Sequence, residues 1–305
     1  MIFMAQNQAI KKEASLFTQV ASLKPPYPNV LEIIKQNSQI LPVDALNGSN
    51  WTLTDSNSSQ HLKRMEESGV TLSNYVEGKI YYGLKTGFNK AFVIDGAKRE
   101  QLIAQDSKSV EIIKPLFVGN NIRKWHARNK NKWLIVTSIG IDIKSYPAVY
   151  EHLKQWQPEL EKRYDKGDYW WELRACKYYN EFDKPKIIFP DIAKESRFTF
   201  DDTGAYLGNT AYIISLQDFY LLGVLNSASV WNYAKNKFRC LGDPNKGGRF
   251  RFINQSVTNI PIPPASDSEK EAISKLVQKC LDAKGVGCEV WEKEIDDRVA
   301  ALYGL

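Results

Sequence analysis

Apolar residues fall in short runs along this chain, and the period of the runs changes from place to place. Runs rich in β-branched and aromatic residues are typical of strands. They are Lys79–Tyr82, Ala91–Ile94, Trp133–Thr137, Lys186–Phe189 and Ala211–Ser215. Apolar residues at helical spacing occupy three other stretches: Val110–Val118, Tyr146–Tyr164 and Phe219–Lys237. This succession predicts an α/β fold, with a mixed sheet and flanking helices.

Glycine and proline set the expected ends of several elements. His61–Ser68 is expected to be the end of a helix that stops at Gly69. A glycine turn separates the strands expected at 79–82 and 91–94, so we expect these two strands to pair. Pro158 predicts a kink in its helical stretch, because proline lacks the backbone N–H that a helix uses.

The pattern divides the chain into three expected segments. Residues 1–45 form a lead-in, where a proline-rich break separates two short helix-like stretches. Residues 46–265 form the mixed α/β domain, which ends in the extended segment Ile260–Pro264. Residues 266–305 are expected to be helical, with a break at Gly285–Gly287. Their apolar stripe must pack against their own domain or against a partner helix. It comprises Ile273, Leu276, Val277, Cys280 and Leu281 before the break, and Val290, Ile295, Val299 and Leu302 after it.

Positive charge is concentrated before the helical tail. The net charge of the 305 residues is +6, and residues 266–305 contribute −3 with nine acids and six bases, so the first 265 residues carry +9. Gly119–Gly140 has five bases and no acid, and Lys235–Phe252 has six bases and one acid. Such clusters suit a polyanion, because each cation placed at a phosphate releases a condensed counterion. Charge alone leaves solvated basic loops as an equal alternative.

Other composition features narrow the class of protein. The four cysteines and three histidines show no spacing that suits zinc, so no metal site is expected. Unpaired, widely spaced cysteines are typical of a reducing cytoplasm. Met1–Lys12 lacks the pattern of a secretory signal, and the longest apolar run, Phe219–Leu225, is too short to span a bilayer. A cytoplasmic protein without membrane segments is therefore expected.

The segment Gly83–Asn89 (GLKTGFN) is the first candidate for binding chemistry. Its two glycines allow a tight turn and a close approach to another surface. Lys85, Thr86 and Asn89 offer donors of the kind that contact phosphates and base edges. The spacing is not that of a phosphate-binding P-loop. A plain hairpin turn is the alternative.

The segment Gly242–Arg251 (GDPNKGGRFR) is the second candidate. On an extended strand, Arg249 and Arg251 would point to one face, and Phe250 and Phe252 to the other. Two guanidinium forks on one face suit phosphate or guanine contacts. A solvated loop is the alternative here.

Three further motifs point away from catalysis by this chain. The aromatic run Tyr169–Trp171 before Arg174 could stack on nucleobases, but a core anchor with one surface arginine is favoured. Pro190-Asp191 lacks the nearby second half of a PD-(D/E)xK nuclease site. Lys24–Tyr27 (KPPY) has lysine where amino-methyltransferases need Asn or Asp in their base-flipping motif.

Taken in order, several motifs make the chain resemble the TaqI-like C-terminal specificity domain. That domain is found in type IIG restriction–modification enzymes, related adenine methyltransferases and BREX-type phage-defence methyltransferases. The resemblance covers roughly residues 50–305. Its motifs are Trp51–Leu53, Val76–Asp95, Ser109–Trp125, Tyr146–Arg174, Lys184–Ile188, Lys246–Arg251, Ile260–Pro263 and Glu294–Leu305.

The resemblance implies a target-recognition domain over 46–265 that binds double-stranded DNA, followed by a helical spacer or docking segment. It implies a separate adenine-N6 methyltransferase domain or subunit, in cis or in trans, that uses S-adenosylmethionine. No cofactor and no catalytic residue are expected on this chain. The expected DNA-binding residues are Lys85, Thr86, Asn89, Lys90, Arg123, Lys124, Arg174, Lys246, Arg249 and Arg251. The alternative is a protein–protein docking module that recruits a methyltransferase or nuclease.

Overall fold

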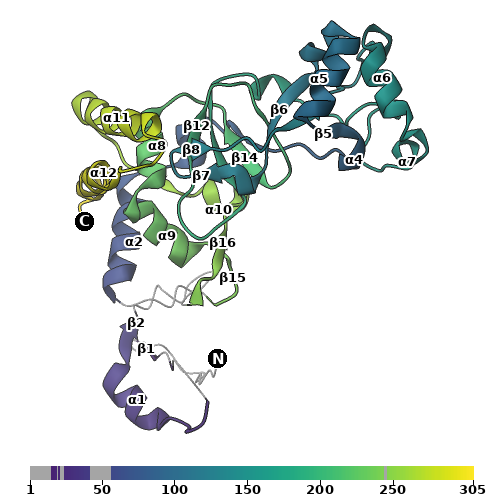
Figure 1. Cartoon of the computed structure of the whole chain (residues 1–305). Helices are drawn as coiled ribbons and strands as arrows, with labels where there is room; N and C mark the ends of the chain where they lie inside the picture. The colour runs from purple at the N-terminus through teal and green to yellow at the C-terminus, as the bar shows by residue number, and fades with distance from the viewer. Residues whose placement is uncertain (1–14, 19, 21–23, 42–55, 244–245) are drawn as a thin grey trace. The chain divides into compact units, whose positions relative to one another are not determined.

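The computed structural model of the chain is shown in Figure 1. The residues it describes are 15–18, 20, 24–41, 56–243 and 246–305. Part of the lead-in, residues 42–55 and with them the motif Trp51–Leu53 lie outside these residues. Among the described residues, no helix is long and apolar enough to cross a membrane.

The chain divides into two compact units, residues 1–67 with Leu305 and residues 68–304. In the first unit, strand β1 (Ser15–Phe17) pairs antiparallel with β2 (Gln39–Leu41), and α1 (Val30–Asn37) lies between them in sequence. Helix α2 (Ser56–Ser68) ends one residue before Gly69, as expected. Before the prolines, the described residues form β1 rather than the expected short helix, because they are paired with β2. The expected domain boundaries at 45 and 265 stay a prediction.

In the second unit, one four-stranded antiparallel sheet has the order β12-β10-β14-β4. Its strands are Thr199–Asp201, Lys186–Pro190, Ala211–Ile214 and Ile80–Tyr82. The central strands β10 and β14 are buried along their whole length and pair from Ile187–Ile214 to Pro190–Ala211. The two core strands expected at 186–189 and 211–215 are therefore confirmed.

A second four-stranded sheet has the order β13-β6-β9-β5, with the β13–β6 pair parallel and the other pairs antiparallel. Its strands are Tyr206–Leu207, Ile113–Phe117, Lys132–Ile135 and Val93–Asp95. One three-stranded sheet, β11-β16-β15, comprises Ile192–Ala193, Arg249–Arg251 and Cys240–Leu241. Two strand pairs complete the set: β3 (Val70–Thr71) with β17 (Pro261–Ile262), and β7 (Ile122–Arg123) with β8 (His126–Ala127). The expected mixed-sheet α/β fold is confirmed.

Helices cover both ends of this unit (Figure 1). Helices α4, α5, α6 and α7 lie with β5 and β6 at one end, and α8, α11 and α12 at the other. The α-helices of the unit are α3 (Leu72–Tyr75), α4 (Asn89–Phe92), α5 (Gly96–Gln105), α6 (Pro147–Lys154), α7 (Gln157–Glu161), α8 (Phe219–Asn226), α9 (Ala228–Lys237), α10 (Asn254–Val257), α11 (Asp267–Asp282) and α12 (Glu289–Leu302). Among the described residues of the unit, short 3-10 turns also occur at Ser107–Glu111, Gly119–Asn121, Ile143–Ser145 and Tyr179–Glu181.

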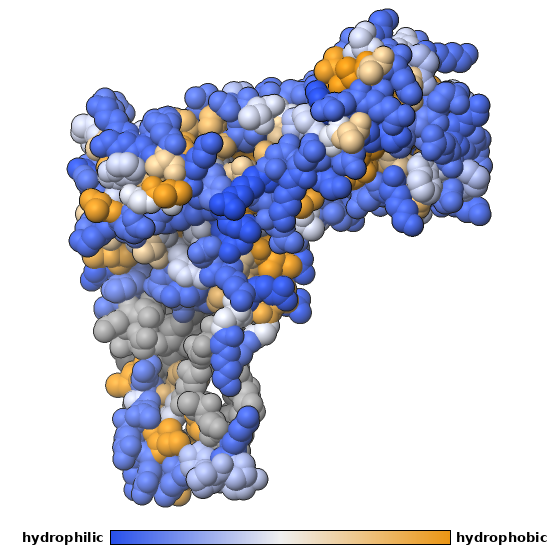
Figure 2. Space-filling view, in the orientation of Figure 1, coloured by the Kyte–Doolittle hydropathy of each residue, from blue (hydrophilic) through white to orange (hydrophobic). Residues whose placement is uncertain are grey.

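One apolar core joins the two four-stranded sheets. It contains Ile188 and Ile213 from one sheet, Ile113 and Leu134 from the other, and Val149 from α6. Polar side chains cover most of the visible face of this unit in Figure 2, with apolar atoms in small separate groups. The shared core therefore holds the two sheets together, and the polar residues lie on the surface.

The C-terminal helices belong to the same compact unit, since α11 packs against α8 and α12. A Cβ on Gly223 of α8 would lie 2.6 Å from a methyl group of Ile273, so this glycine permits the close approach of α11. The Tyr303 hydroxyl donates a hydrogen bond to Pro261 O (2.6 Å) and so fastens the chain end to β17. The expected stripe is buried at Ile273, Leu276, Val277, Cys280, Ile295 and Val299, and half-buried at Leu281 and Leu302. Val290, however, is 76% exposed, so its place on that stripe was wrong.

Two further expectations about local structure were wrong. The strands near 79–82 and 91–94 do not form a hairpin: β4 pairs with β14 and β5 with β9, because Asn89–Phe92 turns into the helix α4 between them. The stretch 110–118 is a 3-10 turn followed by the strand β6 rather than a helix. Its apolar run is short enough to fit a helix or a strand. Residues 113–117 form a strand because they pair with β9 and β13.

Three other expectations about local structure were confirmed at least in part. The stretch 146–164 is helical, but it consists of two helices, α6 and α7, that are separated before Pro158, and Pro158 lies in the first turn of α7 instead of kinking one helix. The helix expected at 219–237 is the pair α8 and α9. The strand expected near Trp133 is β9.

Candidate nucleic-acid interface

The segment Gly83–Asn89 is a loop that lies directly against another backbone. A Cβ on Gly83 would lie 2.1 Å from Gly208 O, so only glycine allows this approach. Leu84 follows at once with a hydrogen bond from its N–H to Leu207 O (2.7 Å). Gly87 has a φ of +68°, in the left-handed region. Both glycines are therefore required by the backbone, which the composition of the loop indicated.

Thr86 holds this loop in shape from the inside. Its side chain is 6% exposed, and its hydroxyl donates to Asn89 Oδ1 (2.6 Å) and accepts from the Phe88 N–H (3.1 Å). Lys85, Asn89 and Lys90 are exposed. Of the four residues proposed from this loop, three thus present their side chains to solvent, and Thr86 is engaged within the loop.

Arg163, which the sequence did not single out, fastens the loop to a second one. Its guanidinium Nη atoms donate to the carbonyl oxygens of Thr86 (2.6 Å), Trp170 (2.7 Å) and Glu172 (2.9 Å). Its side chain is 7% exposed and lies over the Phe92 ring. Burial lowers the pKa of Arg163 to about 10, which still leaves it charged at neutral pH. One buried cation therefore joins residues 83–89 to residues 163–172.

The second loop, residues 163–172, has its own buried support in Glu172. The carboxylate of this residue is fully buried and accepts hydrogen bonds from the N–H groups of Gly140 (2.8 Å), Asp168 (2.8 Å) and Tyr169 (3.0 Å). Trp171 stacks on Tyr169 with ring centroids 4.6 Å apart, and Trp170 and Trp171 pack against the core. The core-anchor interpretation of this aromatic run therefore holds for the two tryptophans, whereas Tyr169 remains more than half exposed.

Next to this loop pair lies a hollow of about 420 Å³ with a basic rim. Lys85, Arg174 and Lys177 line it, and all three are exposed. Arg174 also forms an ion pair with Asp165 (3.3 Å). The structure therefore brings together Lys85 and Arg174, two of the expected residues that lie about ninety positions apart in sequence, and adds Lys177.

The second basic feature is the outer face of the sheet β11-β16-β15. Phe250 on β16 and Phe252 just after it are buried and pack against Trp231, while Arg249 is exposed and Arg251 half-buried on the other side. This alternation of side chains is the one expected for a strand.

Two further cations accompany these arginines. The Arg251 N–H donates to Arg239 O (3.0 Å) on the neighbouring chain segment, so Arg239 lies directly across from it and is exposed. The Lys194 ammonium approaches the position of a Cβ on Gly247 to 3.7 Å. Lys246 is exposed and pairs with Asp243 at 3.8 Å, whereas Pro244 and Asn245 lie outside the described residues. Arg239, Lys194, Arg249 and Arg251 are here called the basic sheet face.

Tyr82 connects the hollow with the basic sheet face. It lines the hollow and packs against Tyr212, with ring centroids 4.8 Å apart. Burial raises the pKa of Tyr82, and nearby Arg251 opposes that increase. Burial likewise raises the pKa of Asp191, again against the charge of Arg251. Arg251 therefore lies among tyrosine rings and one carboxyl at the junction of the two features.

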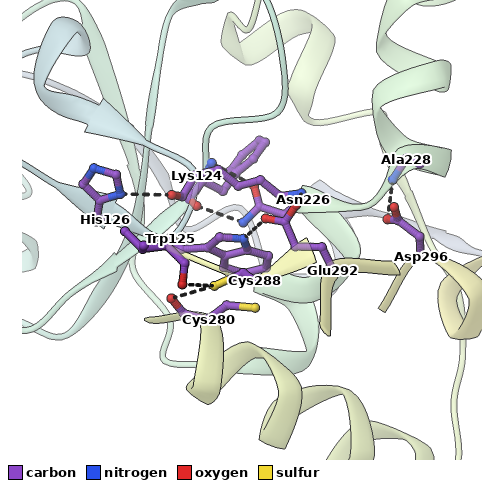
Figure 3. A network of polar contacts seen from close by, with 11 residues as sticks. Lys124, Trp125, His126, Asn226, Ala228, Cys280, Cys288, Glu292 and Asp296 are labelled. Carbon is purple, nitrogen blue, oxygen red and sulfur yellow. Dashed lines mark hydrogen bonds and ion pairs between the residues drawn. The ribbon is translucent and has the colours of Figure 1, made fainter. Parts of the chain in front are cut away.

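Arg123 and Lys124 both interact with groups of their own chain, and Figure 3 shows Lys124 beside Glu292. Lys124 forms an ion pair with Glu292 of α12 (3.2 Å), and the same carboxylate accepts a hydrogen bond from the buried Trp125 indole. Arg123 donates to the carbonyl oxygens of Asn120 (3.0 Å) and Ile122 (2.8 Å). These two expected DNA-binding residues thus support the turn between β7 and β8, and Lys124 helps to hold α12.

Sequence reasoning did not select Arg163, Lys177, Lys194 and Arg239. Arg239 lies within the basic cluster that the charge count found, so its position in that cluster was an available signal. Lys194 and Lys177 are neighbours of the site only through strand pairing and loop packing. Arg163 donates hydrogen bonds to backbone carbonyl groups of two loops, and every residue has such a group. The sequence therefore contains no signal for its role.

Part of this chain matches a known domain family, and the chain is similar in sequence to type II methyltransferases. Residues 114–262 match the TaqI-like C-terminal specificity domain. The chain is 26% identical over 247 residues to the type II methyltransferase M.BanIII of Aneurinibacillus aneurinilyticus, covering 73% of this chain and 41% of that protein. It is also 26% identical over 235 residues to the type II methyltransferase M.MjaIV of Methanocaldococcus jannaschii, covering 72% and 76%. The chain therefore spans less than half the length of M.BanIII.

The fold is also similar to that of a solved enzyme. The type IIL restriction–modification enzyme MmeI, in a structure with DNA, superposes with a TM-score of 0.57 and 16% sequence identity, over 74% of this chain and 32% of that one. The matched segment 114–262 contains the second loop, one side of the hollow and the basic sheet face. Residues 114–262 therefore match the TaqI-like C-terminal specificity domain, and the chain as a whole is similar to type II methyltransferases.

Proposed function

We propose that the chain binds double-stranded DNA sequence-specifically, as the target-recognition part of an adenine-N6 DNA methyltransferase in a restriction–modification or phage-defence system. A separate methyltransferase domain or subunit, in cis or in trans, would hold S-adenosylmethionine and transfer the methyl group. This chain would supply binding and no catalytic group. The observation that carries the proposal is the basic sheet face within a specificity domain.

Electrostatics support DNA as the ligand of that face. The basic sheet face lies on three adjacent strands or just beyond their ends. On the opposite side, Phe250 of β16 packs against Trp231 and so holds the strand in place. Guanidinium groups held in this way can form paired hydrogen bonds with phosphate or with the major-groove edge of guanine. Arg249 and Arg251 are therefore proposed as base-reading residues, and Lys246 as a phosphate-binding one.

The hollow supports a second point of contact. Three exposed cations at one rim attract an anion, and its volume of about 420 Å³ is more than a phosphate group needs. Lys85 and Arg174 are proposed to bind phosphate oxygens there, and the exposed Lys90 is proposed as a further phosphate contact outside the hollow. Asn89 is proposed to contact a base edge, because its side-chain amide offers both a donor and an acceptor.

A docking module for another protein has less support. That alternative relied on a free apolar stripe along the C-terminal helices. Most of the stripe is buried within the same compact unit, where α11 packs on α8 and α12. The helices α11 and α12 therefore pack within the same unit as the basic sheet face and the hollow.

Fluorescence anisotropy with a labelled mixed-sequence duplex tests the proposal over a series of salt concentrations. The whole chain is expected to bind with an affinity that falls steeply as salt rises. Lys246→Ala should weaken binding and reduce the log–log salt slope by about 1. Lys275→Ala, which removes an exposed lysine on α11, is the matched control and should leave binding unchanged. Absence of salt-dependent binding by the unaltered chain refutes the proposal.

A second assay tests the assignment of the chemistry. The chain alone is incubated with DNA and S-adenosylmethionine, and neither methylation nor cleavage is expected. Either product would place catalysis on this chain and would overturn that part of the proposal.

A further inference from the structure

Among the described residues of the second unit, Tyr164 is the most exposed large hydrophobic side chain, and its exposure is complete at 100%. Full exposure of a tyrosine ring leaves about 150–250 Å² of aromatic surface in water. Most tyrosines of this unit are instead buried or half-buried. A ring that packs on nothing in its own chain is available to pack on a ligand.

The backbone on either side of Tyr164 is held in place. Arg163 immediately before it makes the buried hydrogen bonds that join the two loops. Asp165 immediately after it pairs with Arg174 at the rim of the hollow. A Cβ on Gly87 would lie 3.1 Å from Asp165 O, so the loop 83–89 is in contact with the same point. The ring is therefore presented from a supported backbone beside the basic rim.

The charges around the ring favour a nucleic acid as its ligand. Lys162 and Lys166 flank it in sequence and are exposed, and Lys85 and Arg174 line the neighbouring hollow. Lys166 also donates to Glu161 O (2.7 Å), which keeps its ammonium near the loop. An aromatic ring among cations is the combination that binds single strands, with cations at the phosphates and the ring on a base. In a duplex, an inserted side chain reaches a base face where a base step is partly unstacked.

We propose that Tyr164 stacks on a nucleobase at a partly unstacked step of the bound duplex while the cations of the hollow hold the adjacent phosphates. The proposal rests on the DNA-binding function given above and adds a contact that is not electrostatic. A tyrosine suits this role because only two side-chain torsions must be fixed on binding, so little conformational entropy is lost.

The test uses the whole chain and the anisotropy assay with the mixed-sequence duplex. Tyr164→Ala is expected to weaken binding roughly 5- to 100-fold, which corresponds to about 1–3 kcal/mol at 1.4 kcal/mol per tenfold. The salt slope should not change, because stacking releases no counterions. Tyr164→Phe keeps the ring and should bind like the unaltered chain. Tyr27→Ala removes another exposed tyrosine, in the first unit, and serves as the matched control.

Each outcome bears on one of the two proposals. Wild-type affinity in Tyr164→Ala overturns the stacking contact and leaves the DNA-binding function standing. An equal loss in Tyr164→Phe also overturns it, because the hydroxyl would then carry the contact. If the unaltered chain itself shows no salt-dependent binding, the proposed function fails first. Circular dichroism of each variant confirms that the fold is retained, which is expected for a residue without packing contacts.

Discussion

Arg163 gives the sharpest prediction about the structure, because one buried side chain joins two loops. In Arg163→Ala, the carbonyl oxygens of Thr86, Trp170 and Glu172 lose a charged donor at 2.6–2.9 Å. In Arg163→Lys, the charge remains but a single ammonium replaces the planar fork. An ammonium cannot reach three carbonyl groups that surround a guanidinium from different sides.

The magnitude follows from the number of hydrogen bonds. A hydrogen bond to a charged group contributes about 1.5–3 kcal/mol net, and three short ones give about 4–5 kcal/mol at the lower end of that range. Desolvation of the guanidinium offsets part of this stabilisation. We therefore expect Arg163→Ala to lower the free energy of unfolding of the second unit by about 3 kcal/mol, and Arg163→Lys by about 2 kcal/mol.

Urea denaturation followed by tryptophan fluorescence measures this change, since Trp170 lies at the hydrogen-bonded loop. Arg174→Ala is the matched control, because it removes an arginine of the same region whose ion pair with Asp165 is exposed. Its expected effect is below about 1 kcal/mol. A loss of less than about 1 kcal/mol in Arg163→Ala, or full stability in Arg163→Lys, would refute the reasoning that the fork joins the loops.

Three more predictions concern packing and pH. Glu292→Ala should lower the free energy of unfolding by about 1–3 kcal/mol, because the buried Trp125 indole N–H loses its acceptor; urea denaturation measures it. Gly83→Ala should greatly reduce soluble expression or unfold the second unit, since its Cβ would lie 2.1 Å from Gly208 O; yield and circular dichroism report this. Burial lowers the pKa of His152, so below pH 6.5 the unfolded chain binds more protons than the folded one and stability falls as the pH drops from 7 towards 5. His152→Gln keeps a donor for Ala91 O and should flatten that decline in urea midpoints.

Each of these predictions has an outcome that contradicts it. Glu271→Ala removes an exposed acid of α11 and should change stability very little, so an equal loss there would mean that Glu292 has no special role. A stable Gly83→Ala variant would show that the backbones can separate. An unchanged decline with pH in His152→Gln would assign the dependence to other groups.

Much of the fold follows from the sequence because apolar runs mark buried strands and helices whatever their partners. The strands around Ile187 and Ile213 and the helices α11 and α12 were predicted for this reason. Strand pairing was not, since it depends on contacts distant in sequence. The expected hairpin across Gly83–Asn89 failed because each strand has a better partner elsewhere, β14 and β9.

The candidate site was predictable in part for a similar reason. The alternation of Arg249 and Arg251 with phenylalanines marks an exposed face and a buried one, and the structure has that arrangement. Lys124 looked equally basic in sequence, yet its ammonium pairs with Glu292 from a segment more than 160 residues away. A cation's partner is set by tertiary contacts, so sequence can find basic clusters but cannot separate free cations from structural ones.

Selection of bound sequences from a pool of random duplexes tests the central claim most directly. The whole chain is immobilised, the DNA it retains at moderate salt is sequenced, and the cycle is repeated. We predict that one short motif is enriched and that Arg251→Ala relaxes the preference at one position of that motif, with a loss of about 1–3 kcal/mol of discrimination there. Retention of DNA without any sequence preference, or no retention at all, would contradict the claim that this chain recognises a DNA target.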